Sequence, residues 1–292
     1  MNRQHFHRIY IEIINRCNLR CSFCPEDHRP ARMLSAGEFD YIASEASAWT
    51  RHICLHVKGE PLLHPQLAEI LSIAARYDLQ VNLTTNATLL SEKKHLLLGT
   101  DAPRQVSLSL HSFDANTMHL TDFHTYLSEA VDFARTFTSR TPGYISFRLW
   151  NLDSGIEGDQ RMRNRMILET LEHAYHLDQP INSHPDKFHG NTLAPRTFLN
   201  FDRLFSWPDL QAPDYGPDGT CYGLRKQLAI LSDGRVVPCC LDNDGHLNLG
   251  NIFTESLASI LKKEKSLRII EDFQNRKINE PLCRRCGYRT RF

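Results

Sequence analysis

The chain has 292 residues, of which 41% are hydrophobic, and its 34 basic residues are balanced by 34 acidic ones. This length suits one large domain, or a domain of about 200 residues with a smaller module. Balanced charge gives no overall field to attract nucleic acid, and no apolar run reaches the roughly 20 residues of a membrane span. The first residues also lack a signal-peptide core. We therefore predict a soluble, cytoplasmic protein with no nucleic-acid or membrane partner.

Strands and helices are predicted to alternate along the first 180 residues. Apolar runs typical of strands occur at residues 7–14, 52–57, 79–85, 105–110 and 144–150. Helical patterns occur at residues 35–49, 65–77, 121–137 and 158–176, the first opening on a capping-box spacing between Ser35 and Glu38. Such βα units predict a parallel sheet with helices on its outer face. Ligands of such sheets bind at the carboxyl ends of the strands.

The second part of the chain has a different character. Residues 177–219 are rich in Pro, Asp, Asn and Gly, which predicts a connector with one or two short elements and the best domain boundary. Residues 226–240 read as a hairpin that turns at Asp233 and Gly234. Thr254 is predicted to cap a following helix. We divide the chain into a domain at residues 1–204 and a smaller α+β module, a β-hairpin plus a helix, at residues 205–292.

The nine cysteines are an odd number in a chain without an export signal, which argues against a disulfide framework. Cys54 lies in an apolar run and is expected to be buried as a small apolar side chain. The other eight comprise three groups and one single residue near the second group: Cys17, Cys21 and Cys24; Cys239 and Cys240; Cys283 and Cys286; and Cys221. This clustering indicates metal binding.

The first group has the spacing Cys-x3-Cys-x2-Cys and directly follows the first predicted strand, in the loop where a ligand site is expected. Three thiolates suit a cubane iron–sulfur cluster, because three cysteines hold three irons and leave the fourth iron open to an outside ligand. The alternative is a zinc site completed by His7 or His28.

Cys17, Cys21, Phe23 and Cys24 give the chain a resemblance to the radical S-adenosylmethionine (SAM) superfamily, which carries Cys-x3-Cys-x-aromatic-Cys after the first strand. The resemblance implies an α/β fold with a partial (β/α)6 TIM-like barrel and a 4Fe-4S cluster whose open iron binds SAM. It further implies that an electron from the reduced cluster, from a reductant such as flavodoxin or ferredoxin, cleaves SAM. The resulting 5′-deoxyadenosyl radical then abstracts a substrate hydrogen.

The same resemblance suggests five SAM-binding residues on later strands. Gly59 and Glu60 match the family's Gly-Gly-Glu-like turn, with Lys58 replacing the first glycine. The remaining matches are Asn86, followed by Ala87 where the family has glycine; Ser109, followed by His111 where aspartate is usual; and Arg148, which could pair with the SAM carboxylate. Each of these residues also has a purely structural interpretation, as a turn glycine, a cap, a strand serine or a surface arginine.

The C-terminal cysteines form a second site, because the hairpin and the Cys283-x2-Cys286 pair can bring four thiolates together. This arrangement resembles the twitch domain, a shortened SPASM domain that holds one auxiliary 4Fe-4S cluster. The predicted ligands are Cys221, Cys239, Cys283 and Cys286, with Cys240 either replacing Cys239 or packing. Zinc is the alternative for four cysteines.

Together these features predict a radical SAM oxidoreductase or maturase that acts on a small molecule or a peptide side chain. Four protein thiolates would leave the auxiliary cluster no open iron, which favours electron transfer. The cluster loop begins at residue 17, so we expect any recognition of a peptide leader to come from a partner protein. The alternative function is a non-catalytic zinc-binding interaction protein. No catalytic side chain is predicted.

Overall fold

The computed structural model describes residues 6–26, 28–113, 122–151, 159–181, 190–202 and 205–291. The chain divides into two compact units, each of which is assembled from separate stretches. Unit 1 comprises residues 1–17, 25–81 and 205–292, and unit 2 comprises residues 18–24 and 82–204. The predicted boundary at Leu204 lies outside the described residues.

Unit 1 contains strands from both ends of the chain, in the order β10-β9-β8-β1-β2. Strand β1 (Arg8–Ile11) pairs in parallel with β2 (His52–Cys54) on one side and with β8 (Gln227–Ile230) on the other. The C-terminal strands β8, β9 (Arg235–Val237) and β10 (Gly250–Asn251) are antiparallel to one another. The expected hairpin is therefore present.

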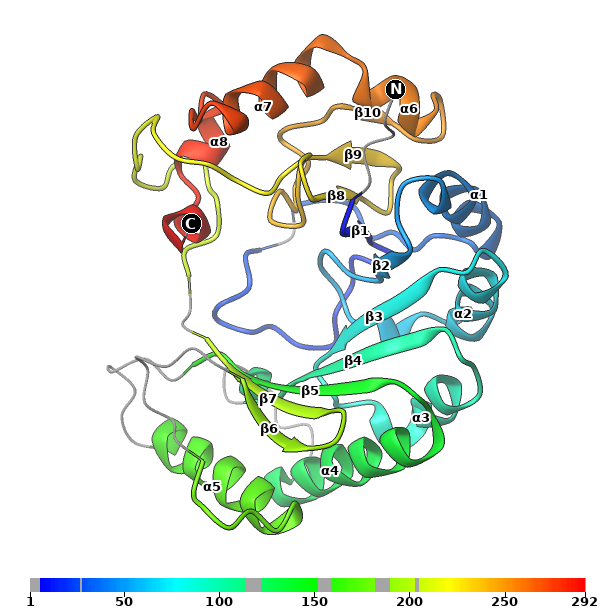
Figure 1. Cartoon of the computed structure of the whole chain (residues 1–292), viewed down its shortest axis with the longest axis vertical. Helices are drawn as coiled ribbons and strands as arrows, with labels where there is room; N and C mark the ends of the chain where they lie inside the picture. The colour runs from blue at the N-terminus through cyan, green and yellow to red at the C-terminus, as the bar shows by residue number, and fades with distance from the viewer. Residues whose placement is uncertain are drawn as a thin grey trace. The chain divides into compact units, whose positions relative to one another are not determined.

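The helices of unit 1 are amphipathic, and most of their apolar residues are buried, although Tyr41 and Leu267 are exposed. Helices α1 (Ala36–Ser47) and α2 (Leu67–Arg76) pack side by side (Figure 1). The short η1 (Pro61–Leu63) follows β2, and α6 (Leu257–Leu261), α7 (Glu264–Gln274), α8 (Pro281–Arg284) and η3 (Gly287–Arg291) follow β10. Ile9, Ile11 and Ile53 are fully buried, so these strands form the core of the unit.

Unit 2 has the strand order β4-β5-β7-β6, and β3 (Gln80–Thr85) crosses the division between the units. Strands β4 (Pro103–Ser109), β5 (Tyr144–Leu149) and β7 (Thr197–Phe201) are parallel, and β6 (Asn191–Ala194) runs antiparallel to β7. Helices α3 (Leu90–Leu98), α4 (Phe123–Arg140) and α5 (Asp159–Ala174) and the short η2 (Leu110–Ser112) complete the unit (Figure 1).

Most predicted elements are confirmed within two or three residues, and the Ser35–Glu38 capping box forms in both directions. One predicted cap is wrong. Ser256, not Thr254, caps α6 by accepting a hydrogen bond from the Ser259 amide at 3.2 Å. The Thr254 hydroxyl instead donates to the Asn251 carbonyl at 3.1 Å, because the chain is still turning there after β10. Helix α3 and the pairing of β7 with β5 were not predicted.

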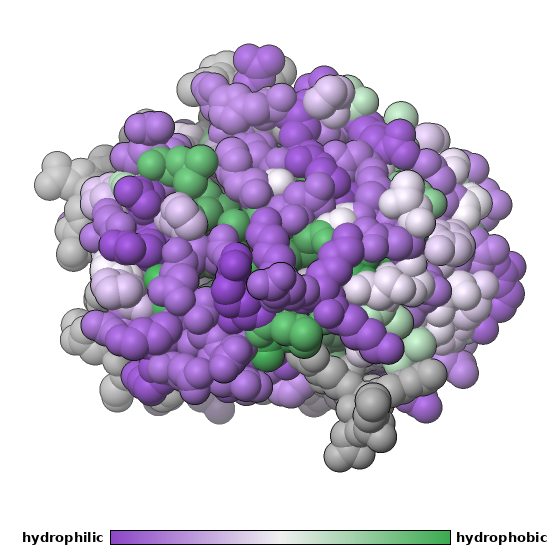
Figure 2. Space-filling model, turned by 90° about the horizontal axis from the view of Figure 1, so that it is seen from above, coloured by the Kyte–Doolittle hydropathy of each residue, from purple (hydrophilic) through white to green (hydrophobic). Residues whose placement is uncertain are grey.

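The surface in Figure 2 is mostly hydrophilic, with hydrophobic side chains in small scattered patches. Among the described residues, every helix is too short or too polar to cross a bilayer.

Candidate functional site

The loop that carries the first three cysteines is closed at its base in unit 1. Ile14 and Met33 form an isolated antiparallel bridge. The Asn15 amide group donates to the Pro30 carbonyl, and its oxygen accepts from the Arg32 amide, both at 2.8 Å. The two ends of the loop are therefore joined at Asn15, and Cys17, two residues beyond it, is exposed.

Cys21 and Cys24 belong to unit 2, in the same loop. A turn joins them, since the Cys24 amide donates to the Cys21 carbonyl at 3.0 Å. The half-buried Cys21 thiol lies 3.7 Å from the Ser112 carbonyl, whereas Cys24 is exposed. The Phe23 ring packs against the His111 imidazole with 5.0 Å between ring centroids. The loop thus presents accessible thiols beside an aromatic contact.

Gly59 and Glu60 follow β2 in a turn that only glycine fits. Gly59 has φ +81°, and a Cβ atom there would lie 2.2 Å from the Ile14 carbonyl oxygen. The Glu60 amide donates to the Arg16 carbonyl at 2.9 Å, next to Cys17. The buried Glu60 carboxylate accepts from the Leu62 amide at 3.0 Å and so caps η1. In this structure the turn therefore contacts and stabilises the base of the loop.

Asn86 lies after β3 and is linked to the cysteine loop by hydrogen bonds within unit 2. Its amide group donates to the Asn18 side-chain oxygen at 2.9 Å, and its own oxygen accepts from the Thr88 hydroxyl at 2.7 Å. The Asn18 amide group closes the ring by donating to that hydroxyl at 2.8 Å. Ala87 adopts φ +67°, the left-handed conformation for which the family's glycine is suited. Asn86 therefore holds the residue next to Cys17.

Ser109 and Arg148 are brought together, because they are opposite each other in the β4–β5 register. The Arg148 guanidinium lies 4.9 Å from the centroid of the Trp150 ring. His111 stacks on Trp150 at 6.0 Å and 11°, and its Nδ1 is 3.1 Å from the Arg148 carbonyl. Burial lowers the pKa of His111 to about 4, so the imidazole is neutral at pH 7. A continuous contact series runs from Phe23 through His111 to Trp150.

The C-terminal thiols converge within unit 1. Burial raises the pKa of Cys239 well above its usual value, and the neighbouring cysteines raise it further. Those neighbours are Cys221, Cys240, Cys283 and Cys286. Burial likewise raises the pKa of Cys283, reinforced by Cys221 and Cys286. The Gly223 amide donates to the Cys221 thiol at 3.4 Å. The four predicted ligands thus share one electrostatic environment.

Cys240 has additional neighbours of its own. It packs against a buried apolar group that includes Val57 and Leu231, and burial raises the pKa of its thiol to about 12. The same thiol interacts with the Tyr10 hydroxyl, whose pKa is raised mainly by burial. Cys54 is buried as expected, on the strand next to Tyr10. Cys239 and Cys240 therefore face different surroundings.

The donor set suits iron–sulfur clusters. None of the nine cysteines, all of which the structure describes, is in a disulfide, and the described residues contain no group of three His, Cys, Asp or Glu side chains placed to hold a single metal ion. A mononuclear zinc site draws its sulfurs to about 2.3 Å from one metal. A cluster suits thiols that are near one another without such close packing, because each thiolate binds a different iron.

Reasoning from the sequence missed Asn18 and Thr88, which hold Asn86, and Glu12 and Arg29, a buried ion pair at the loop base. For Asn18, the signal that the sequence offered was its position between two cysteines of the loop. For Glu12, a carboxylate within an apolar strand run was a signal too, because buried charges need partners.

Two family models match the chain. Residues 11–143 match the model described as the radical SAM superfamily, and residues 221–287 match SPASM, an iron–sulfur cluster-binding domain. Among curated relatives, a GTP 3′,8-cyclase of Microcystis aeruginosa is 36% identical over 119 residues, covering 37% of this chain and 35% of that protein. A PqqA peptide cyclase of Gluconobacter oxydans is 34% identical over 87 residues, covering 28% of this chain and 24% of that protein. The matched region is thus about a third or less of the length of these relatives.

Solved structures match over more of the chain. BtrN in complex with AdoMet and 2-DOIA has a TM-score of 0.59 at 13% identity, covering 97% of this chain and 93% of that one. Streptococcus suis SuiB bound to the precursor peptide SuiA has a TM-score of 0.62 at 15% identity, covering 97% of this chain and 71% of that one. At these identities the likeness is one of fold, and it confirms the expected α/β fold with a TIM-like barrel architecture.

Proposed function

Since the chain belongs to the radical SAM superfamily and carries a C-terminal SPASM-type domain, we propose that it is an enzyme that cleaves SAM reductively and abstracts hydrogen from its substrate. The family's cofactors are SAM, the 4Fe-4S cluster that binds it and an auxiliary cluster. When bound, the first cluster supplies the electron that converts SAM to methionine and the 5′-deoxyadenosyl radical. That radical takes a hydrogen atom from the substrate and becomes 5′-deoxyadenosine.

Cys17, Cys21 and Cys24 would hold the SAM-binding cluster. The support is their spacing, their accessibility and a loop base fixed by Asn15. Three thiolates on four irons leave one iron for SAM. For SAM itself, Gly59, Glu60, Asn86, Ser109 and Arg148 remain predictions. Of these, Ser109 and Arg148 have the stronger support, because they are neighbours at the carboxyl ends of β4 and β5.

The observation that carries the proposal is the convergence of a separate set of four thiols. Cys221, Cys239, Cys283 and Cys286 act on one another electrostatically. They can ligate all four irons of an auxiliary cluster and leave no iron for substrate, so we assign this cluster to electron transfer. It would accept the electron released when the substrate radical is oxidised.

The substrate is proposed to be a small molecule or a peptide side chain. BtrN is described with the small molecule 2-DOIA, and SuiB with a precursor peptide. A reductant such as flavodoxin or ferredoxin is needed to supply the first electron.

The test is metal and sulfide analysis of anaerobically reconstituted protein, followed by incubation with SAM and a reductant. We expect about eight iron and eight sulfide per chain, from two 4Fe-4S clusters, and formation of 5′-deoxyadenosine. Stoichiometric zinc without labile sulfide would overturn the proposal and favour the zinc-binding alternative. Incubation with panels of small molecules and of peptides then distinguishes the substrate classes.

A further inference from the structure

A single buried carboxylate connects the base of the three-cysteine loop to the C-terminal hairpin. Glu12 follows the last residue of β1, and its side chain is fully buried. Its partners come from three segments of unit 1 that are far apart in sequence: the return of the loop at Arg29, the turn before Gly59 at Lys58, and the β8–β9 turn at Ser232.

The contacts of Glu12 satisfy both of its oxygens. Arg29 binds the carboxylate with two hydrogen bonds, of 2.6 and 2.7 Å, and its side chain is only 6% exposed. One oxygen also accepts from the Ser232 amide at 3.0 Å and from the Ser232 hydroxyl at 2.9 Å. The other accepts from the Lys58 amide at 3.3 Å. The energy of a buried charge with this many donors depends strongly on where the donors lie, because moving any donor leaves a charged group unsatisfied.

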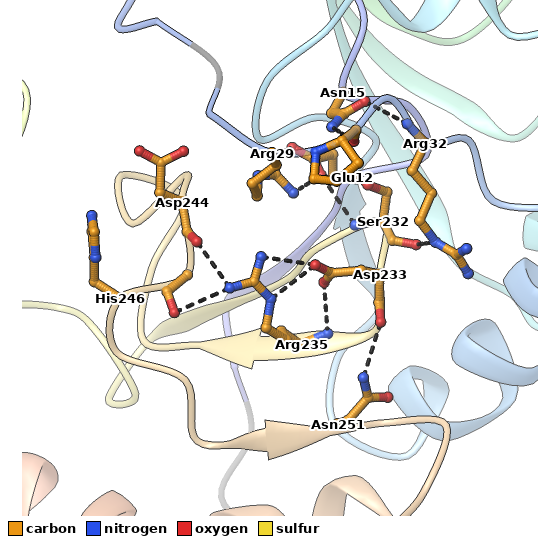
Figure 3. A network of polar contacts seen from close by, with 12 residues as sticks. Glu12, Asn15, Arg29, Arg32, Ser232, Asp233, Arg235, Asp244, His246 and Asn251 are labelled. Carbon is orange, nitrogen blue, oxygen red and sulfur yellow. Dashed lines mark hydrogen bonds and ion pairs between the residues drawn. The ribbon is translucent and has the colours of Figure 1, made fainter.

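Ser232 is held from the loop side as well. Its carbonyl accepts from the Arg32 guanidinium, and the Arg32 amide in turn donates to Asn15. Figure 3 shows Glu12, Arg29, Asn15 and Arg32 gathered above the β8–β9 turn. Both backbone groups of Ser232 are thus bonded to residues of the loop base, 200 or more positions away in the chain.

The turn beyond Ser232 is held by several hydrogen bonds, and the strand that follows it leads to the second cysteine site. The Asp233 carboxylate accepts from the Arg235 amide and guanidinium, and Asn251 donates to the Asp233 carbonyl at 2.9 Å (Figure 3). Arg235 also donates to the Asp244 carbonyl at 2.9 Å. Strand β9 then runs toward Cys239. The turn that contacts Glu12 is therefore continuous with the strand that leads to Cys239.

We propose that Glu12 is a positioning residue that couples closure of the three-cysteine loop to the position of the hairpin bearing Cys239. The carboxylate can be satisfied only when Arg29 and Ser232 are both in place. By thermodynamic linkage, disturbing either partner then loosens the other. The proposal rests on the proposed function only in treating these segments as the bases of two cluster sites.

The test is hydrogen–deuterium exchange of the full-length, anaerobically purified protein, measured by mass spectrometry without SAM or substrate. Ser232→Ala removes one hydroxyl donor, and we expect residues 29–34 to exchange about threefold to tenfold faster, as suits one lost hydrogen bond. Glu12→Gln should accelerate exchange in residues 29–34 and 231–237 together by about a hundredfold, because it leaves Arg29 buried without its carboxylate.

A matched control separates coupling from general destabilisation. Ile42→Val removes one methylene from a fully buried position in α1, outside this network. It should lower the melting temperature without selective acceleration in the two segments. A Glu12→Gln/Arg29→Gln variant removes both charges and should melt closer to the wild type than Glu12→Gln does, while both segments still exchange faster than in the wild type.

Two results would overturn the inference: acceleration confined to the hairpin in Ser232→Ala, or the same acceleration of residues 29–34 in Ile42→Val at equal loss of stability. Because no turnover or cluster signal enters the measurement, its failure is distinguishable from failure of the proposed function, which metal analysis decides.

Discussion

The two cysteine sites differ in how far the fold exposes their thiols. Cys17 and Cys24 are exposed on a loop that is tied at its base, whereas each of the C-terminal ligand candidates is half-buried. Burial raises the pKa of Cys239 and of Cys283, and the neighbouring thiols raise both further. A set of three with two exposed thiols suits a cluster that must also bind an outside ligand, and a set of four half-buried thiols suits one that exchanges only electrons.

Burial also gives the second site a structural consequence. Burial and the neighbouring thiols disfavour the thiolate forms there, so an iron–sulfur cluster held as proposed would stabilise those forms and contribute free energy to folding. The three-cysteine loop is held instead by hydrogen bonds in which the Asn15 and Glu12 oxygens accept and the Asn86 amide group donates.

The largest effect is expected for Cys21→Ala, which removes one of three thiolates from the open site. We expect complete loss of 5′-deoxyadenosine formation and of the SAM-induced change in the electron paramagnetic resonance spectrum. Cys54→Ala, a buried cysteine outside both sets, is the control and should retain both signals. Undiminished SAM cleavage by the Cys21 variant would contradict the assignment.

The double variant Cys283→Ala/Cys286→Ala should separate the two sites by role. We expect SAM cleavage to persist, at least slowly, while product formation fails because the electron acceptor is missing. The measurement is the yield of 5′-deoxyadenosine beside that of product, on protein first shown to be folded. Loss of both yields with a lower melting temperature would indicate a folding role, and full product formation would exclude electron transfer by the second cluster.

Acid should affect the surroundings of the open site through His111, next to Phe23. Burial lowers its pKa from 6.5 in the unfolded chain to about 4 in the folded protein. Because the folded protein holds His111 neutral, the stability linked to this group is fully present above pH 6.5. It is lost as the pH falls toward 4, by about 3 kcal/mol in all. The measurement is the free energy of unfolding of the wild type and of His111→Gln, obtained by denaturant unfolding across this pH range. The difference between the two values is then followed as a function of pH. A difference that does not vary with pH would contradict the prediction.

A smaller effect is expected for Gly59→Ala beside the loop base. The strained φ and the contact with the Ile14 carbonyl should lower the free energy of unfolding by about 2 kcal/mol. Gly37→Ala in α1 is the matched control, since a Cβ there meets nothing within 4 Å, and it should be neutral or stabilising by up to about 1 kcal/mol. Thermal or urea unfolding compares the two, and equal stability of both variants would show that the turn tolerates a side chain.

The sequence by itself determined the features that depend on neighbours along the chain. Apolar periodicity located five strands and four helices, the Ser35–Glu38 spacing marked a true capping box, and the cysteine spacing indicated the family. These signals are local, because a helix cap, a strand or a thiol loop is formed by residues within a few positions of one another.

Tertiary structure decided what depends on residues far apart. Ser256 rather than Thr254 caps α6 because the chain after β10 is still bonded to Asn251. Glu12 meets Ser232 across 220 positions, and Asn86 meets Asn18 across 68. Such pairs leave no periodic trace in the sequence, since any buried carboxylate or amide must find a partner but the fold alone selects which one.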